Sequence, residues 1–122
     1  MGAARADLTL DQGSTKSWIL SLTDDNGDEI DLSNCSVKAT AKRNASASTG
    51  YDFSCTITDE LLGKIQLKML ASVSSTMELI SSNVAEKTKT VFSYDVFVTF
   101  SDQQPVMVLE GTLTVNPKNT EV

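Results

Sequence analysis

The stretch VFSYDVFVTFSDQQPVMVLEGTLTV, residues 91–115, decides the fold. Apolar and polar side chains alternate along both of its halves, which is typical of strands with one buried face. SDQQ, residues 101–104, fits a four-residue hairpin loop, and Pro105 fits a strand start. The inward positions are Phe92, Tyr94, Val96, Val98 and Phe100 on the first strand, and Met107, Leu109, Gly111, Leu113 and Val115 on the second. The stretch therefore predicts a long antiparallel hairpin.

The same alternation recurs along the rest of the chain, in residues 6–10, 17–23, 37–42, 51–58 and 64–69. About seven short strands separated by turn-rich joints predict an all-β fold, a single antiparallel immunoglobulin-like β-sandwich. A chain of 122 residues fits one domain, residues 1–122. We expect its core to cover about residues 6–116 and its tail, residues 117–122, to be polar and projecting.

One segment breaks the alternation: ASVSSTMELISS, residues 71–82. Val73, Met77 and Ile80 are spaced as on one face of a helix. We expect one short helix near residues 72–81, capped by Ser74 or Ser75, that covers one end of the sandwich.

The composition excludes several classes of function. The net charge of −6 and the sequence pI near 4.4 argue against binding to nucleic acid or to an anionic membrane. The sequence has no apolar run of 18 residues, and its first residues do not resemble a secretory signal. We therefore expect a soluble protein that is synthesised in a cytoplasm and has either protein partners or none.

The sequence contains no histidine, so it lacks the commonest general base and the commonest metal ligand. It also contains no phosphate-binding glycine loop, nucleophile elbow or zinc motif. We expect no enzyme activity, no catalytic residue and no cofactor. The sequence does not decide whether Cys35 and Cys55 are bonded, but Cys55 occupies an inward strand position, where a free cysteine acts as a small apolar residue.

The stretch TDDNGDEIDL, residues 23–32, surrounds an Asn-Gly pair with carboxylates, as a calcium loop does. With Gly27 as the sixth residue of an EF-hand loop, however, the first ligand position falls on Leu22 and the twelfth on Ser33. The motif therefore fails, and we expect no metal site. An irregular calcium site formed by Asp24, Asp28 and Asp31 is the alternative.

Backbone geometry explains the same stretch better. A three-residue turn, Asp25-Asn26-Gly27, with its glycine in the left-handed region, sets Leu22 against Ile30 and Leu20 against Leu32. The apolar side chains then share one face, which a two-residue turn would not allow. We therefore predict a structural turn here.

The hairpin register suggests a candidate subunit interface. With SDQQ as the loop, Asp95 faces Glu110 and Phe97 faces Val108 on the outer surface, where Val106 also lies. The apolar side chains would form a small exposed patch, and the two carboxylates would cost a few tenths to about 1 kcal/mol. Either another part of the chain covers the patch, or a partner subunit covers it and supplies Lys or Arg to the acidic pair.

The order of the segments resembles a known family. DLTLDQGST, SWILSLTDDNGDEIDLSN, VKATAKR, YDVFVTF and VLEGTLTVNP follow one another as in the immunoglobulin-like N-terminal domain of tailed-phage baseplate upper proteins and related tail or fibre-connecting proteins. The resemblance covers about residues 7–117. Its motifs are short: D-x-N-G followed by I-D-L, and a closing G-T-L-T-V-N-P.

The resemblance implies a non-enzymatic virion protein that docks other tail or baseplate proteins. Because the sequence stops soon after Val115 without a coiled-coil or fibre segment, we expect a small adaptor or ring subunit, present in several symmetric copies. Its location would be the virion, after synthesis in the host cytoplasm. The alternatives are a capsid decoration or cement protein and, from another class, a carbohydrate- or calcium-binding adhesion module.

Overall fold

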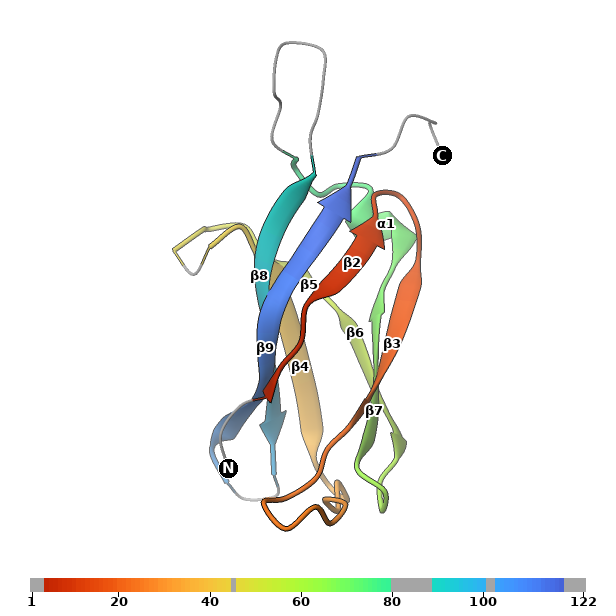
Figure 1. Ribbon diagram of the computed structural model, residues 1–122, viewed down its shortest axis with the longest axis vertical. Coiled ribbons are helices and arrows are strands. Elements are labelled where there is room, and N and C mark those ends of the chain that lie inside the picture. Colours follow the sequence, from red (N-terminus) through yellow and green to blue (C-terminus); the bar gives the residue numbers. More distant parts are fainter. Residues whose placement is uncertain (1–3, 45, 80–88, 101–102, 118–122) are drawn as a thin grey trace.

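Strands make up most of the computed structural model, which describes residues 4–44, 46–79, 89–100 and 103–117 (Figure 1). In chain order the elements are β1 (Ala4–Arg5), β2 (Leu8–Asp11), β3 (Lys16–Ser21), β4 (Ser36–Lys42), β5 (Tyr51–Asp52), β6 (Ser54–Asp59), β7 (Lys64–Met69), α1 (Ala71–Ser74), β8 (Thr90–Thr99) and β9 (Pro105–Asn116).

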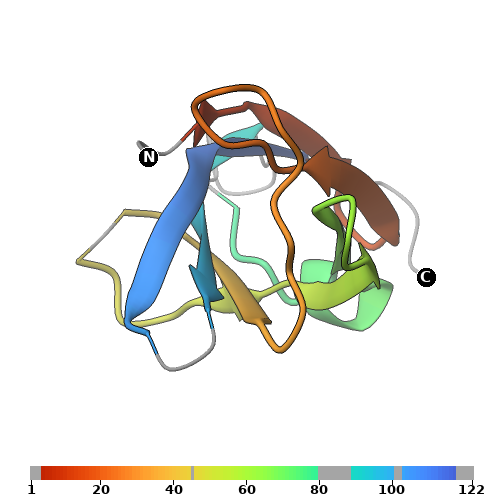
Figure 2. The same cartoon turned by 90° about the horizontal axis from the view of Figure 1, so that it is seen from below.

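The strands form two sheets around one apolar core (Figure 2). The larger sheet has the order β1-β9-β8-β4-β5, with β2 also paired to β9, and the smaller sheet has the order β3-β7-β6. The chain passes repeatedly from one sheet to the other, as it does in immunoglobulin-like sandwiches. The predicted fold class, an all-β immunoglobulin-like sandwich, is confirmed.

The predicted strand over residues 51–58 is divided between the two sheets. Its first part, β5, pairs with β4 in the larger sheet, and its second part, β6, pairs with β7 in the smaller sheet. Phe53 is buried at the crossing, where its backbone N–H donates to the carbonyl of Ala39 at 3.0 Å. The alternation continues through the crossing because both sheets bury one face in the same core.

The N-terminal strands correct the prediction of a purely antiparallel sandwich, because β1 and β2 pair with β9 in parallel. The register places Ala4 beside Leu109 and Leu8 beside Leu113. Parallel neighbours need a long connection, and here most of the domain lies between them. Alternating side chains reveal the faces of a strand but not its direction, so the sequence pattern could not show this pairing.

The pairing with β9 is interrupted at Ala6 and Asp7, where Tyr94 reaches across Gly111. The Tyr94 hydroxyl donates to the Ala6 carbonyl oxygen at 2.7 Å, and this oxygen lies where a β-carbon on Gly111 would be. The backbone N–H of Thr112 donates to the Asp7 carboxylate at 3.2 Å. Hydrogen bonds from the backbone and side chain of Thr112 lower the pKa of Asp7. The strands can meet in this way only because Gly111 has no side chain.

The helix predicted near residues 72–81 is a single turn, α1, within the described residues, and Ile80 lies outside them. Leu70 is its N-cap and makes no side-chain capping bond, so the predicted capping by serine is wrong. Ser74 is fully buried instead, where its hydroxyl accepts from the N–H of Gly13 at 3.1 Å and donates to the carbonyl of Ser14 at 2.8 Å. The turn is thus fastened to the β2–β3 connection.

Aromatic side chains join the two sheets through the core. Trp18 of β3 meets Phe53 edge-on with 6.0 Å between ring centroids, and Phe53 lies 5.9 Å from the ring of Tyr94 on β8. Trp18 is half-buried against the core. Within the described ranges, no helix is long and apolar enough to cross a membrane.

We expect Gly111→Ala to lower the free energy of unfolding by about 1–3 kcal/mol, because the added methyl group overlaps the Ala6 carbonyl. Urea unfolding measures this change. Thr114→Ala on the outer face of the same strand is the control, and it should cost less than about 1 kcal/mol. Equal effects of the two substitutions would contradict the close approach at Gly111.

Candidate functional site

A row of polar side chains crosses the outer face of the larger sheet. Each member is the register partner of the next: Asp52 on β5, Thr40 on β4, Asp95 on β8, Glu110 on β9 and Arg5 on β1. Their neighbours along the central strands are buried, so strand alternation turns this row toward solvent. The prediction that Asp95 and Glu110 lie opposite each other is confirmed.

Asp95 and Glu110 form a non-hydrogen-bonded pair, which is the antiparallel pair type with the shorter distance between α-carbons. The Glu110 carbonyl accepts from the N–H of Ala6 at 3.0 Å, so the peptide groups of Glu110 point toward β1 rather than β8. Asp95 and Glu110 are therefore a non-hydrogen-bonded pair, with α-carbons about 4.5 Å apart. Like charges in this position destabilise the folded state.

No cation within the described residues forms an ion pair with either carboxylate. The Arg5 guanidinium lies 3.7 Å from the Asp7 carboxylate instead. The Thr40 hydroxyl donates its one proton to Asp52 at 2.8 Å. Burial raises the pKa of Asp95, the charge of Glu110 adds to this rise, and Lys42 partly opposes it. A partner that supplied a positive charge here would therefore relieve a repulsion present in the folded chain.

The apolar part of the predicted interface is changed by a β-bulge. Pairing between β8 and β9 begins at Thr99 and Pro105, so the connection is residues 100–104 rather than 101–104. The register then shifts between Val96 and Phe97, where β9 contains one extra residue. The longer loop and the bulge cancel each other, which is why the register on the far side of the bulge agrees with the prediction.

As a result, Phe97 lies opposite Met107 rather than Val108. Val108 is only 3% exposed and belongs to the core, while Val106 pairs with Val98 and packs partly buried against the core. The prediction that Val106 and Val108 form an outer patch is therefore wrong. The bulge turns Val108 inward and leaves Phe97 and Met107 as half-buried side chains of the outer face.

Met107 was misplaced together with Val106 and Val108, since strict alternation put Met107 in the core. One signal was present: Val106–Leu109 is an unbroken apolar run inside an otherwise alternating strand. A bulge produces such a run, because it lets two consecutive residues face the core.

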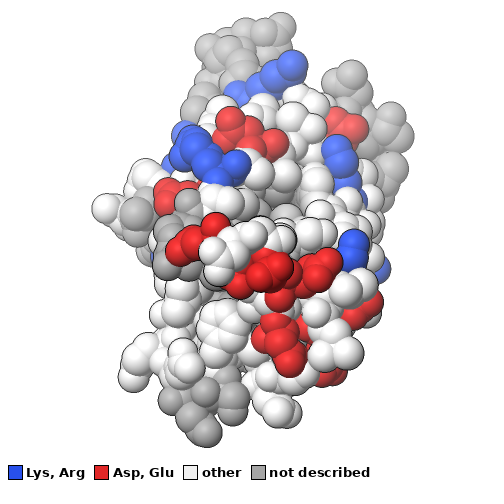
Figure 3. Space-filling model, turned by 60° about the horizontal axis from the view of Figure 1, so that its bottom comes forward, with Lys and Arg blue, Asp and Glu red and all other residues white. Residues whose placement is uncertain are grey.

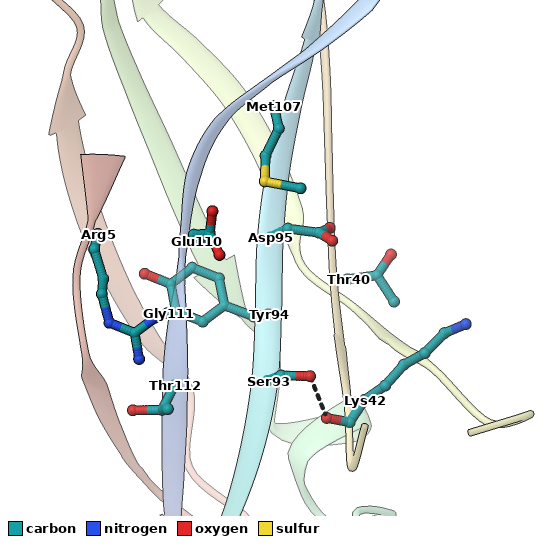
Figure 4. Close-up of a pocket in the computed structure, with 10 residues that line it drawn as sticks. All are labelled: Arg5, Thr40, Lys42, Ser93, Tyr94, Asp95, Met107, Glu110, Gly111 and Thr112. Carbon is teal, nitrogen blue, oxygen red and sulfur yellow. Dashed lines mark hydrogen bonds between the residues drawn. The ribbon is translucent and has the colours of Figure 1, made fainter. Parts of the chain in front are cut away.

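Grooves lie on both sides of Asp95 and Thr40 on this face. The larger has a volume of about 530 Å³ and extends past Glu110 to Arg5, and the smaller extends past Phe97. Asp95 and Glu110 both line the larger groove, where the Asp95 carboxylate is turned toward Thr40 and away from Glu110, and Met107 lies toward one end (Figure 4). We call the surface formed by Asp95, Glu110, Phe97 and Met107 the outer groove face. It offers an apolar contact next to two carboxylates, which suits a protein partner.

The acidic turn has the predicted geometry. Gly27 has φ of 84°, in the left-handed region, and the N–H of Asp24 donates to the carbonyl of Asp28 at 2.8 Å. The N–H of Ile30 donates to the carbonyl of Leu22 at 3.2 Å. Asp25, Asn26 and Gly27 are thus the loop of a three-residue turn.

The predicted continuation of this hairpin is wrong. Leu20 pairs with Ile65 of β7, and the N–H of Leu32 donates to the carbonyl of Glu60 at 2.8 Å. The turn between β6 and β7 separates the two chain segments, since Gly63 packs against the backbone on both sides without space for a β-carbon. The sequence pattern could not reveal this intervening turn.

The carboxylates of the turn are used by its own backbone. Asp24 accepts from the N–H groups of Asn26 at 2.9 Å and Asp28 at 3.0 Å, and Asp31 accepts from the N–H of Ser33 at 2.9 Å. Among the described residues, no group of three or more His, Cys, Asp or Glu side chains is placed to hold a metal ion. The geometry favours a structural turn over a calcium site.

Exposed carboxylates nevertheless gather at this end of the sandwich, where residues 23–32 meet the turn at residues 59–63 (Figure 3). We call it the acidic end. Cys35 and Cys55 are both half-buried, and burial raises the pKa of Cys55. A neutral, half-buried thiol is a poor nucleophile.

No protein-family model and no curated protein matches the sequence. Among solved structures, murine CRIg is similar to this chain with a TM-score of 0.40 and 10% identity, over 93% of this chain and 92% of that chain. An internalin-like protein of Listeria monocytogenes is similar with a TM-score of 0.39 and 17% identity, over 96% of this chain but 29% of that chain. The fold assignment rests on the strand order and register described above.

The raised pKa of Asp95 predicts how stability depends on pH. The folded protein binds a proton at the Asp95 carboxylate more tightly than the unfolded chain does. The loss of stability caused by the charge on Asp95 is therefore absent below the ordinary pKa of 3.8 and grows as the pH rises through the raised pKa. We expect Asp95→Asn to stabilise the protein at pH 7 by a few tenths to about 1 kcal/mol, and to lose this advantage near pH 3. Thermal unfolding at both pH values measures the difference. Asp52→Asn is the control, because Asp52 accepts a hydrogen bond and should show no such gain.

Calcium gives a second test at the acidic turn. Because the Asp24 and Asp31 carboxylates already accept backbone hydrogen bonds, we expect millimolar calcium to leave the melting temperature unchanged. Magnesium at the same ionic strength is the control. A rise with calcium that Asp28→Asn abolished would establish a cation site instead.

Proposed function

We propose that this chain is a non-enzymatic structural protein of a tailed-phage virion, an adaptor subunit of the tail or baseplate that acts through protein-protein contacts. The observation that carries the docking role is the outer groove face. There, Asp95 and Glu110 are register partners, no cation among the described residues forms an ion pair with them, and Phe97 and Met107 lie next to them on an open sheet.

The physical argument for docking concerns what the free chain leaves unsatisfied. Asp95 is partly buried and repelled by Glu110, and the two apolar side chains beside them are partly exposed. A Lys or Arg from a partner would remove the repulsion, and an apolar partner side chain would cover Phe97 and Met107. Both contributions favour the bound state over the free one. The face therefore suits a protein with a positive charge beside an apolar side chain.

The placement in a phage tail is supported by the order of the sequence segments. The D-x-N-G motif forms the acidic turn, I-D-L is the segment that follows it before β4, and the closing G-T-L-T-V-N-P is the end of β9. An immunoglobulin-like sandwich is the fold that the resemblance to baseplate upper proteins implies. A sandwich of this size serves as an adaptor between larger components, in several symmetric copies.

The location is tested by electron cryomicroscopy of the phage particle that carries the chain. We expect density for the sandwich at the tail or baseplate in repeated copies. Density on the head alone would instead support a decoration protein, and purified particles without the chain would reject a virion role.

The docking face is tested by the double variant Phe97→Ser with Met107→Ser. Because both side chains are only half-buried, we expect the variant to stay folded but to be incorporated into particles at least about tenfold less, the equivalent of 1.4 kcal/mol in binding. Quantitative mass spectrometry of purified particles measures incorporation. Gln66→Ser with Lys68→Ser, on the outer face of the smaller sheet, is the control and should be incorporated normally. Normal incorporation of the first variant would reject the outer groove face as the docking surface.

A further inference from the structure

A second surface lies on the smaller sheet, at the open edge of β3. β3 pairs with β7 on one side, and no other described strand pairs with it. Leu22 continues the ladder, since its N–H donates to the carbonyl of Gly63 at 2.8 Å. Peptide groups alternate in direction along an antiparallel strand, so even-numbered residues bond to β7. The N–H and C=O groups of Ser17, Ile19 and Ser21 therefore point away from the sheet.

The side chains along this edge are apolar for a solvent-facing strand. Ile19 is 57% exposed at the centre of β3, and its neighbours Trp18 and Leu20 are only half-buried. Proteins usually protect an exposed edge with lysine, proline or a very short strand. Lys16 gives such protection only at the start of β3, where its ammonium lies 5.8 Å from the centre of the Trp18 ring and donates to the Thr9 carbonyl on β2 at 3.1 Å. The centre of β3 has none among the described residues.

We propose that two copies of this chain pair antiparallel through β3, with Ile19 opposite Ile19 of the partner subunit. The two smaller sheets would then join into one continuous sheet. This pairing depends only on the geometry of β3, so it stands or falls separately from the proposed phage function.

The β3 sequence is self-complementary in this register. Ser17 opposes Ser21 of the partner subunit, Trp18 opposes Leu20 of the partner subunit, and no two like charges face each other. Each outward peptide group of β3 finds a donor or acceptor on the partner strand. A shift by two residues would place Ile19 against a serine, and a shift by one would exchange the buried and exposed faces.

Charge favours the antiparallel direction. Each copy carries a net charge of −6, and β3 leads directly into the acidic end (Figure 1). Antiparallel pairing sends the two acidic ends in opposite directions, whereas parallel pairing would place them side by side and repelling. A second copy thus fits the edge best when it is related by a two-fold axis through Ile19.

The mass of the full chain in solution, measured by sedimentation over a wide concentration range, tests the pairing. We expect a monomer–dimer equilibrium in the wild type. Ile19→Lys should raise the dissociation constant at least about tenfold, because like charges would meet on the axis. Thr56→Lys is the matched control, since Thr56 lies in the same row of the sheet on the opposite edge, and it should leave the equilibrium unchanged.

Melting temperatures of both variants should stay close to the wild type, because both positions are exposed. A wild-type chain that is monomeric at every concentration would overturn the proposal. So would equal effects of the two lysine substitutions.

Cross-linking fixes the register. Hydrogen-bonded antiparallel pairs have α-carbons about 5.5 Å apart, within the range that a disulfide spans. Ile19→Cys should therefore form a covalent dimer under mild oxidation, much faster than Thr56→Cys or the wild type. Equal rates for the three proteins would show that Ile19 does not lie on the two-fold axis.

Discussion

The contact between Tyr94 and Ala6 across Gly111 holds the two ends of the described chain together. A tyrosine hydroxyl buried in the core needs a partner, and the Tyr94 hydroxyl bonds a backbone carbonyl of the N-terminal segment. The bond is possible because the glycine opposite Tyr94 leaves space for that carbonyl. The Tyr94 side chain, the absence of a side chain at Gly111 and the interruption of the parallel pairing at Ala6 therefore depend on one another. Together they close the larger sheet over the core.

The composition of the outer face of the larger sheet results from the alternation of inward and outward residues along its strands. Every second residue of β8 must enter the core, so the residues between them are placed outside whatever their chemistry. This constraint leaves Asp95 beside Glu110, a pairing that offers the isolated chain no stabilisation. A repulsion that a positive charge from a partner would relieve is the physical basis of the proposed docking surface.

The sequence predicted the fold well where the alternation of inward and outward residues alone decides the structure. The inward residues of β8, the opposition of Asp95 and Glu110 and the left-handed glycine of the acidic turn all follow from period-two patterns. It failed where an extra residue or a distant segment intervenes. Val108 enters the core because the bulge adds one residue to the alternation of β9. Leu32 does not pair with Leu20, because the β6–β7 turn lies between the two chain segments. The parallel direction of β2 could not be predicted, because the alternation of apolar and polar residues is the same in parallel and antiparallel strands.

The parallel pairing of β1 and β2 with β9 also affects how the chain folds during synthesis. Within the domain, β1 and β2 leave the ribosome before the other strands, and their partner β9 leaves it after them. Ala4 and Leu109 must therefore find each other across nearly the full length of the chain, a slow step of high loop-closure entropy. Until then the side of the core under β2 stays uncovered, and a nascent chain exposes it to aggregation or to a chaperone. The pairing of β1 and β2 is complete only when β9 has been made.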